Sequence, residues 1–263
     1  MAPQHSESIA RRAVGQPVRS FLTALGFLSI IPVGTRGATG QSSFAAALFY
    51  FPLVGLLLGG LAAVFFLVLQ SILPPLVVGA LLAVLLSMLP GFIHLDGLAD
   101  TADGFFSGTP RERCLEIMRD SRIGVMGSAA ICCLLIVKTA ALASIGAGQM
   151  VAALLVAVTA GRASMVCTMA LLPYARSESG LGLLFYSGAT RQAAVVSVLL
   201  LAVLVLVLAG RRFLPIFGIA AVLLLVLAAL CRKKIGGATG DTLGATCEMM
   251  ETAILTLYSM TLS

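Results

Sequence analysis

Residues 44–69 read FAAALFYFPLVGLLLGGLAAVFFLVL, and no charged side chain occurs in them. A helix needs about 20 mainly apolar residues to cross a bilayer, so this stretch predicts a membrane span. The whole chain has the same character, with 59% hydrophobic and 11% charged residues among its 263. Soluble domains carry about 25% charged residues. The sequence therefore predicts an all-α, polytopic membrane helix bundle.

Further apolar runs predict about seven transmembrane helices in total. Glu248 and Glu251 interrupt the last run, so six spans followed by a re-entrant segment are the alternative. Gly59-Gly60 in the first span is typical of helices that pack closely in lipid. The predicted spans cover residues 44–69, 76–93, 125–145, 150–172, 193–209, 213–230 and 243–262.

Residues 1–43 are interpreted as a basic N-terminus and an interfacial or re-entrant segment over 21–33, with a signal sequence as the alternative. Residues 44–263 then form one integral-membrane catalytic domain. A cytoplasmic N-terminus places the loops at 96–122, 173–191 and 232–242 in the cytoplasm, as the positive-inside rule asks. Arg211-Arg212 opposes this orientation.

The stretch HLDGLADTADG at residues 94–104 breaks a run from 37 to 94 without any Asp, Glu, Lys or Arg. Asp96, Asp100 and Asp103 are spaced i, i+4 and i+7, which places them on one helix face. Carboxylates that repel one another require a cation, and Mg²⁺ prefers oxygen ligands. We therefore expect a metal or phosphate site here; a solvated interfacial helix is the alternative.

Two later stretches carry charges suited to phosphate. In Arg119-Asp120-Ser121-Arg122, the arginines can clamp phosphate oxygens and Asp120 can orient one of them or bind metal. Residues 236–245, GGATGDTLGA, combine backbone amides at a helix start with the carboxylate of Asp241, which is alternatively only an N-cap. Further candidates are Ser121, Gly240, Thr242, Lys138, Arg162 and Arg176 for substrate, and Asp120, Glu248 and Glu251 for metal, with the two glutamates facing the Asp cluster.

These stretches together resemble the cobalamin synthase, or adenosylcobinamide-GDP ribazoletransferase, family. The matching pieces are YFPLVG at 50–55, HLDGLADTADG at 94–104, RDSRIG at 119–124, PYAR at 173–176 and GGATGDTLGA at 236–245. The resemblance implies an inner-membrane enzyme with Mg²⁺ as cofactor. It would join adenosylcobinamide-GDP to α-ribazole, or its 5′-phosphate, and release GMP. Asp103, or else Asp241, would act as general base, while Arg119, Arg122 and Lys138 or Arg162 would stabilise the leaving group.

Other classes fit the sequence less well. A CDP-alcohol phosphotransferase needs Asp-Gly-x-x-Ala-Arg, whereas Asp96-Gly97 continues to Leu98-Ala99-Asp100. An ion-coupled transporter would spread its acids through several spans, but six of the eleven acids lie between Asp96 and Asp120. Scattered basic residues argue against nucleic-acid binding. The six cysteines are expected to be reduced, and homo-oligomerisation, the acceptor and the number of metal ions stay open.

Overall fold

The computed structural model describes residues 9, 15–33, 41–176 and 181–260, and this part of the chain forms helices without strands. The predicted all-α fold is confirmed. An isolated parallel bridge joins Tyr174 to Ala238. The α-helices are α2 (Pro17–Leu28), α3 (Gln41–Ala47), α4 (Phe51–Leu69), α5 (Pro75–Met88), α6 (Ile93–Phe106), α7 (Arg111–Ile117), α8 (Val125–Ser144), α9 (Ala147–Leu171), α10 (Thr190–Ala209), α11 (Phe213–Ile235) and α12 (Gly240–Ser259), with short 3₁₀ turns at Leu48–Tyr50, Leu181–Phe185 and Gly210–Arg212.

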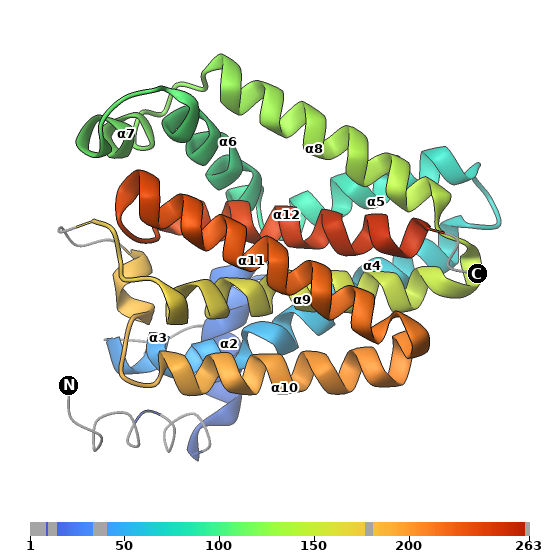
Figure 1. Ribbon diagram of the computed structural model, residues 1–263. Helices are drawn as coiled ribbons and strands as arrows, with labels where there is room; N and C mark the ends of the chain where they lie inside the picture. Colours follow the sequence, from blue (N-terminus) through green and yellow to red (C-terminus); the bar gives the residue numbers. More distant parts are fainter. Residues whose placement is uncertain (1–8, 10–14, 34–40, 177–180, 261–263) are drawn as a thin grey trace.

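Helices α9 and α12 form the centre of the bundle (Figure 1). Helix α9 packs against α4, α10 and α12, while α12 also contacts α6, α8 and α11. Glycines allow the closest of these contacts: a Cβ atom at Gly55 or Gly59 would stand 2.7 or 2.8 Å from backbone oxygens of α9. The prediction that Gly59-Gly60 serves close packing is confirmed at Gly59, where only a residue without Cβ fits. It is wrong at Gly60, where a Cβ atom would stand 4.0 Å from the nearest atom, in the Leu155 side chain.

Within the described residues, five helices are long and apolar enough to cross a membrane: residues 42–69, α8, α9, α10 and α11. A sixth span results if α5 and α6 count as one, although they meet at 85°. The predicted second span over 76–93 therefore ends early, because Pro90-Gly91 breaks the helix. Helix α12, predicted as the seventh span, does not count among the five. It lies buried within the bundle.

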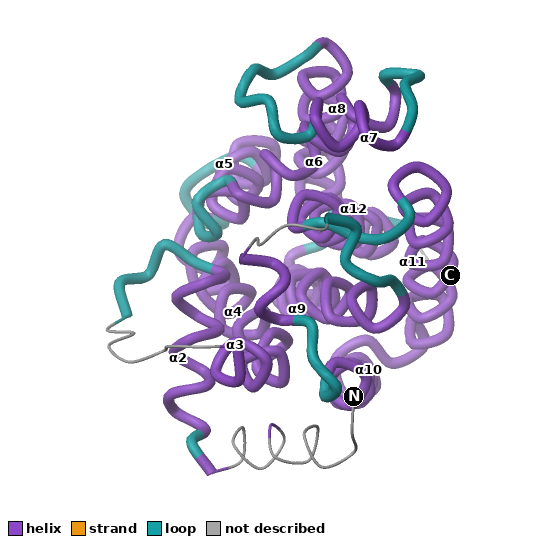
Figure 2. Tube along the Cα trace, turned by 90° about the vertical axis from the view of Figure 1, so that its left-hand side faces the viewer, coloured by secondary structure: helices purple, strands orange, loops and turns teal. Residues whose placement is uncertain are grey.

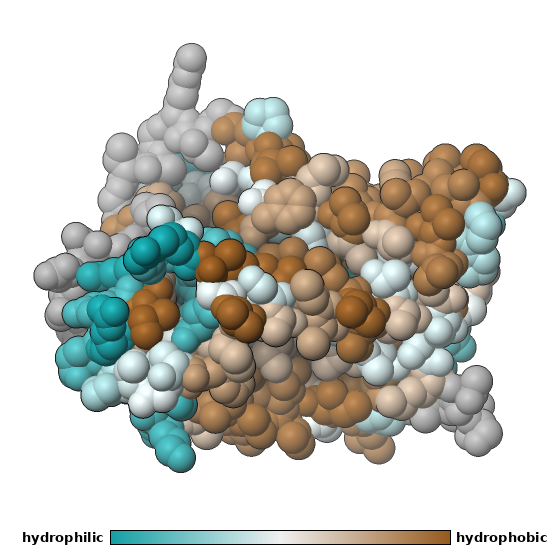
Figure 3. All heavy atoms as spheres, turned by 90° about the horizontal axis from the view of Figure 1, so that it is seen from above, coloured by the Kyte–Doolittle hydropathy of each residue, from teal (hydrophilic) through white to brown (hydrophobic). Residues whose placement is uncertain are grey.

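The polar residues gather at one end of this apolar bundle. Figure 3 shows hydrophilic side chains at the left-hand end and hydrophobic ones over most of the remaining visible face. Figure 2, which looks at this end, shows α6, α7 and the turn into α12 side by side. The motif-bearing segments therefore meet at one end, which is what the predicted topology requires.

The N-terminal region is only partly described. One face of α2, including Ala24 and Leu28, is fully buried against the bundle. Residues 1–8, 10–14 and 34–40 lie outside the described part, and with them Arg11 and Arg12, so the predicted division at residue 43 stays a prediction. Residues 177–180 and 261–263, parts of the predicted 173–191 loop and of the predicted last helix, also lie outside it. All six cysteines are free, as expected.

Candidate active site

The acidic helix α6 begins at a sharp turn of the chain. The turn contains two residues with positive φ, Gly91 at 67° and Phe92 at 62°. The Phe92 amide donates to the Ser87 carbonyl oxygen at 2.9 Å and closes the turn. Glycine adopts this backbone freely, whereas Phe is an outlier there. The turn leads α6 away from the line of α5 and into contact with α12.

One glycine brings the two motif helices into backbone contact. A Cβ atom at Gly97 would stand 2.6 Å from the carbonyl oxygen of Asp241, so only glycine fits between α6 and α12. The contact draws their carboxylates together: the charges of Asp96, Asp241 and Asp103 all act on Asp100. The predicted acidic cluster therefore includes a member from α12.

Asp241 lies in the first turn of α12, where two donors hold it. Its Oδ2 accepts hydrogen bonds from Arg176 at 2.8 Å and from the Thr239 hydroxyl at 3.2 Å. Burial raises the pKa of Asp241, although Arg176 and the Thr239 hydrogen bond act to lower it. Thr239, not Asp241, is the N-cap, and it forms a capping box with Thr242. Asp241 is therefore not the cap, and the Thr242 hydroxyl, predicted to bind substrate, belongs to the box.

A cavity of about 320 Å³, which we call the acidic cleft, opens beside α6. Within the described part of the chain, neither Asp96 nor Asp100 makes a hydrogen bond or ion pair through its side chain. Both carboxylates are therefore available to a cation or a substrate. The acidic cleft is lined by Asp96, Ala99, Asp100, Met118, Arg119, Asp120, Ser121, Ile123 and Ile131.

Asp103, the third carboxylate of α6, has a different environment. Its Oδ2 accepts a hydrogen bond from the Gly124 amide at 2.7 Å, and its Oδ1 accepts one from the Gly127 amide at 2.8 Å. Asp103 therefore holds the N-terminus of α8, where backbone amides favour a negative charge. The i, i+7 spacing did not predict this contact, which gives Asp103 a structural role.

A second cavity, of about 540 Å³, contains three arginines, and we call it the arginine cleft. Arg119 lines both clefts, so they adjoin. Arg111 donates to the carbonyl oxygens of Ile235 at 2.9 Å and Ala175 at 3.1 Å. The arginine cleft is lined by Arg111, Glu112, Leu115, Glu116, Arg119, Ala175 and Arg176.

Arg122 and Asp120 pair with each other at the surface. The guanidinium donates to both carboxylate oxygens, at 3.0 and 2.7 Å, while the Arg122 side chain is 87% exposed. These hydrogen bonds lower the pKa of Asp120 to about 2. Arg119 faces the clefts, so the clamp predicted from the sequence, with two arginines around one carboxylate, is not preformed.

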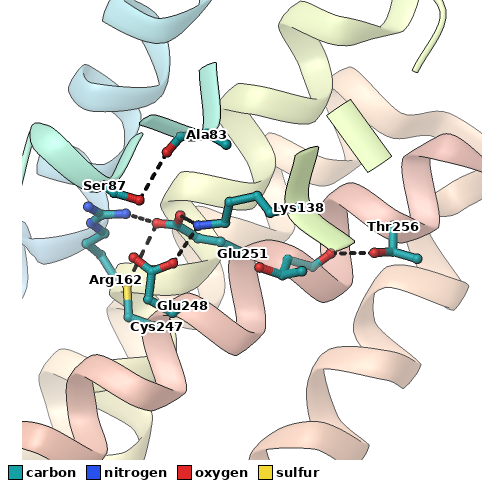
Figure 4. Close-up of polar contacts among 9 residues, drawn as sticks. Ala83, Ser87, Lys138, Arg162, Cys247, Glu248, Glu251 and Thr256 are labelled. Atoms are coloured by element: carbon teal, nitrogen blue, oxygen red, sulfur yellow. Dashed lines mark hydrogen bonds and ion pairs between the residues drawn. The ribbon is translucent and has the colours of Figure 1, made fainter. Parts of the chain in front are cut away.

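Four charged side chains form a buried network between α8, α9 and α12 (Figure 4). Lys138 Nζ lies 2.6 Å from Glu248 and 3.1 Å from Glu251, and Glu251 also pairs with Arg162. Each side chain is at most 1% exposed. We expected the glutamates to face the Asp cluster and the cations to bind substrate. The four groups instead neutralise one another, so we place neither metal nor substrate here.

Three or more His, Cys, Asp or Glu residues do not come together as a metal cage anywhere in the described ranges. This geometry is compatible with Mg²⁺, which keeps several waters and is usually held by one or two carboxylates plus substrate phosphates. Asp96 and Asp100, one helical turn apart and both lining the acidic cleft, supply those donors. The residues present therefore fit the predicted ion.

Comparison with known proteins identifies the family. A model described as cobalamin-5-phosphate synthase matches residues 20–259. The chain belongs to this family. Curated relatives named adenosylcobinamide-GDP ribazoletransferase include proteins of Acetivibrio thermocellus, Desulforamulus reducens and Clostridium acetobutylicum, with 37%, 39% and 35% identity over 92%, 90% and 92% of this chain. The alignments cover 97%, 95% and 96% of those relatives.

The family assignment confirms the predicted resemblance and the prediction that the protein is a transferase of cobalamin biosynthesis. No solved structure matches the chain. The arrangement of the family's motifs must therefore be argued from the geometry described above.

Proposed function

We propose that the protein joins adenosylcobinamide-GDP to α-ribazole, or to α-ribazole 5′-phosphate, with release of GMP. The observation that carries this proposal is that carboxylates of α6 and α12 come together beside two adjoining clefts, one of which contains three arginines. In a chain of the cobalamin-5-phosphate synthase family, this arrangement suits transfer at a pyrophosphate. The products are adenosylcobalamin, or its 5′-phosphate, and GMP.

The reaction breaks a phosphoanhydride bond and forms a phosphoester bond. The 3′-hydroxyl oxygen of the ribazole attacks the phosphorus next to the cobinamide, and the bond from that phosphorus to the GMP oxygen breaks. The hydroxyl proton goes to a base, and the bond electrons leave with GMP. Such a transfer depends on positioning and charge stabilisation more than on covalent help from the protein.

Asp96 and Asp100 would hold Mg²⁺ at the acidic cleft. The bound ion would offset the negative charge of the pyrophosphate oxygens. The two carboxylates otherwise repel each other, and Asp241 adds a third charge. The excess of negative charge in this cleft supports a cation there.

Asp241 is our candidate for the base. Its Oδ1 has no hydrogen-bond partner among the residues described, while Arg176 and Thr239 fix its Oδ2. Burial raises the pKa of Asp241, and a raised pKa brings a carboxylate closer to the range of an efficient base. Asp103, the first candidate from the sequence, has both oxygens engaged by the amides of Gly124 and Gly127 at the start of α8.

The arginine cleft would take the departing nucleotide. Arg119 lines both clefts, and hydrogen bonds hold Arg111 and Arg176 in the arginine cleft. Planar guanidinium groups bind phosphate oxygens in pairs. Arg122 lies further out, paired with Asp120.

We place the protein in the inner membrane, with a cytoplasmic N-terminus and the clefts facing the cytoplasm. The basic residues Arg232, Lys233 and Lys234 end α11 at the same end as the motifs, as the positive-inside rule favours for a cytoplasmic side. Soluble nucleotide substrates would reach the clefts from this side.

A direct assay tests the proposed function. The purified full chain, in lipid nanodiscs, is incubated with adenosylcobinamide-GDP, α-ribazole and Mg²⁺, and GMP and the corrinoid product are quantified. We expect equimolar GMP and adenosylcobalamin. Absence of both, under conditions in which the Desulforamulus reducens relative turns over, would contradict the proposal.

A further inference from the structure

A third cavity, of about 240 Å³, shares the lining residue Asp96 with the acidic cleft, and we call it the aromatic hollow. Phe27, Phe51 and Phe185 form one wall, with ring centroids 4.5 to 6.2 Å apart. Met165, Met169 and Leu243 add further apolar surface. Asp96 lines both cavities, and Asp241 lines the hollow, so the hollow adjoins the reacting groups of the proposed function.

One polar ring in this apolar surrounding has no hydrogen-bond partner among the described residues. His94 lines the hollow and is 2% exposed, and both of its ring nitrogens are unpaired within that part of the chain. Buried polar side-chain atoms in native proteins nearly always have a partner. Lys138 and Arg162 are the buried cations whose charges act on His94. Both are hydrogen-bond donors that already pair with glutamates, and neither can accept a hydrogen bond from His94.

The position of His94 is fixed by the backbone. A Cβ atom at Gly244 of α12 would stand 3.0 Å from the Cα atom of His94, so the two helices touch at this residue. The same pair of helices touches again at Gly97 and Asp241. His94 is therefore held rigidly beside Asp96 and Asp241, as a residue that positions a ligand must be.

We propose that the aromatic hollow binds the planar heteroaromatic base of the acceptor nucleoside, and that an N–H of His94 donates to the base's unsubstituted ring nitrogen. This inference rests on the proposed function, in which the acceptor is the riboside of a dimethylated benzimidazole. Phenylalanine rings and methionine sulfurs contact such a base favourably. An imidazole keeps at least one N–H in either charge state.

Size and position favour the base over the other substrate parts. Pockets for drug-sized ligands measure about 300–1,000 Å³, so a hollow of about 240 Å³ suits a bicyclic base and is too small for a corrin ring. Guanine carries several polar edges that the apolar wall would leave unpaired. With the base in the hollow, the ribose would extend past Asp96 toward Asp241 and the acidic cleft.

Two variants test the proposal, and for both of them the KM for each of the two substrates is measured. His94→Phe keeps a ring but removes the donor, and Met169→Trp fills the hollow. We expect both to raise the KM for α-ribazole about ten-fold, the loss of about one hydrogen bond or an equivalent contact. The KM for adenosylcobinamide-GDP should change less than about two-fold. Met150→Trp is the matched control, because Met150 lies on the same helix but lines a different cavity.

Direct binding separates this inference from the proposed function. Equilibrium dialysis of α-ribazole against wild-type protein in nanodiscs, without the second substrate, should show binding that Met169→Trp weakens about ten-fold and Met150→Trp does not. An unchanged α-ribazole affinity in both His94→Phe and Met169→Trp would overturn the inference while the GMP assay still stood. Absence of GMP release by the wild type would instead overturn the proposed function. If His94→Phe does not fold, the KM of Met169→Trp for α-ribazole and the dialysis measurement still test the inference.

Discussion

Gly97 lies directly against the backbone of Asp241, so that a Cβ atom at Gly97 would stand 2.6 Å from the Asp241 carbonyl oxygen and 2.9 Å from its Cα. Two motifs more than a hundred residues apart in the chain are thereby locked together at one point. The contact sets the distance between the carboxylates of α6 and the candidate base on α12.

Gly97→Ala should therefore reduce turnover strongly while the protein still inserts into the membrane. The added methyl group must push α12 away from α6, and a displacement of about 1 Å in a catalytic site can cost about a hundred-fold in rate. Steady-state GMP release measures this effect. Gly60→Ala is the control, because the nearest atom to a Cβ there is 4.0 Å away, in the Leu155 side chain. Equal losses in both variants would contradict the interpretation.

Asp96→Asn and Asp100→Asn should each lower kcat by at least about a hundred-fold, because a metal contributes several kcal/mol of transition-state stabilisation. Removing divalent ions with EDTA should abolish GMP release, and added Mg²⁺ should restore it in the wild type. Each variant should need more Mg²⁺ for half-maximal rate. Glu116→Gln is the control for the Mg²⁺ dependence alone, since Glu116 pairs with the exposed Arg113 and lines the arginine cleft but not the acidic cleft. Normal Mg²⁺ dependence in both aspartate variants would exclude them as ligands.

Local sequence patterns predicted the parts of the site that lie within one element. The spacing of Asp96 and Asp100 placed both on one helix face, and both do line the acidic cleft. The bend before them was also readable, since Pro90-Gly91 is a helix-breaking pair. Its effect was missed because the apolar run continues past it to Ile93.

Contacts between distant elements could not be read from spacing. Lys138 and Glu248 stand on separate helices, and nothing in either sequence window says which faces meet. Glu251 was predicted to bind metal because its sequence window does not show which residues pack against it. In the structure it pairs with Lys138 and Arg162. The surroundings of His94 could not be read from its sequence window either, because only the structure shows that both ring nitrogens lack partners among the described residues.

Glu251→Gln should destabilise the bundle by about 3–5 kcal/mol, the usual cost of removing one partner from a buried ion pair. Arg162 and Lys138 would each keep a positive charge at no more than 1% exposure with less compensation. Thermal unfolding in nanodiscs, followed by circular dichroism, measures the loss. The double variant Lys138→Met with Glu248→Leu should lose less than the sum of its two single variants. Strict additivity would contradict a coupled network.

The pH dependence of kcat/KM tests Asp241 as the base. Burial holds the pKa of Asp241 above the usual value of about 4, and below that pKa the carboxyl is protonated and cannot accept a proton. Activity should therefore fall as the pH falls, along a limb above pH 4. Asp120, whose pKa is lowered to about 2, adds nothing in this range.

Arg176→Gln removes the cation that lowers the pKa of both Asp241 and Asp100, so the acid limb should move to higher pH whichever of the two carboxylates sets it. The measurement is kcat/KM for α-ribazole between pH 5 and 9, at saturating adenosylcobinamide-GDP, with all rates normalised to folded protein. Arg113→Gln serves as the matched control, because Arg113 pairs only with the exposed Glu116 among the described residues, and its limb should stay at the wild-type position. A lower overall rate in Arg176→Gln without a shifted limb would show that Arg176 binds substrate but that Asp241 does not take the proton.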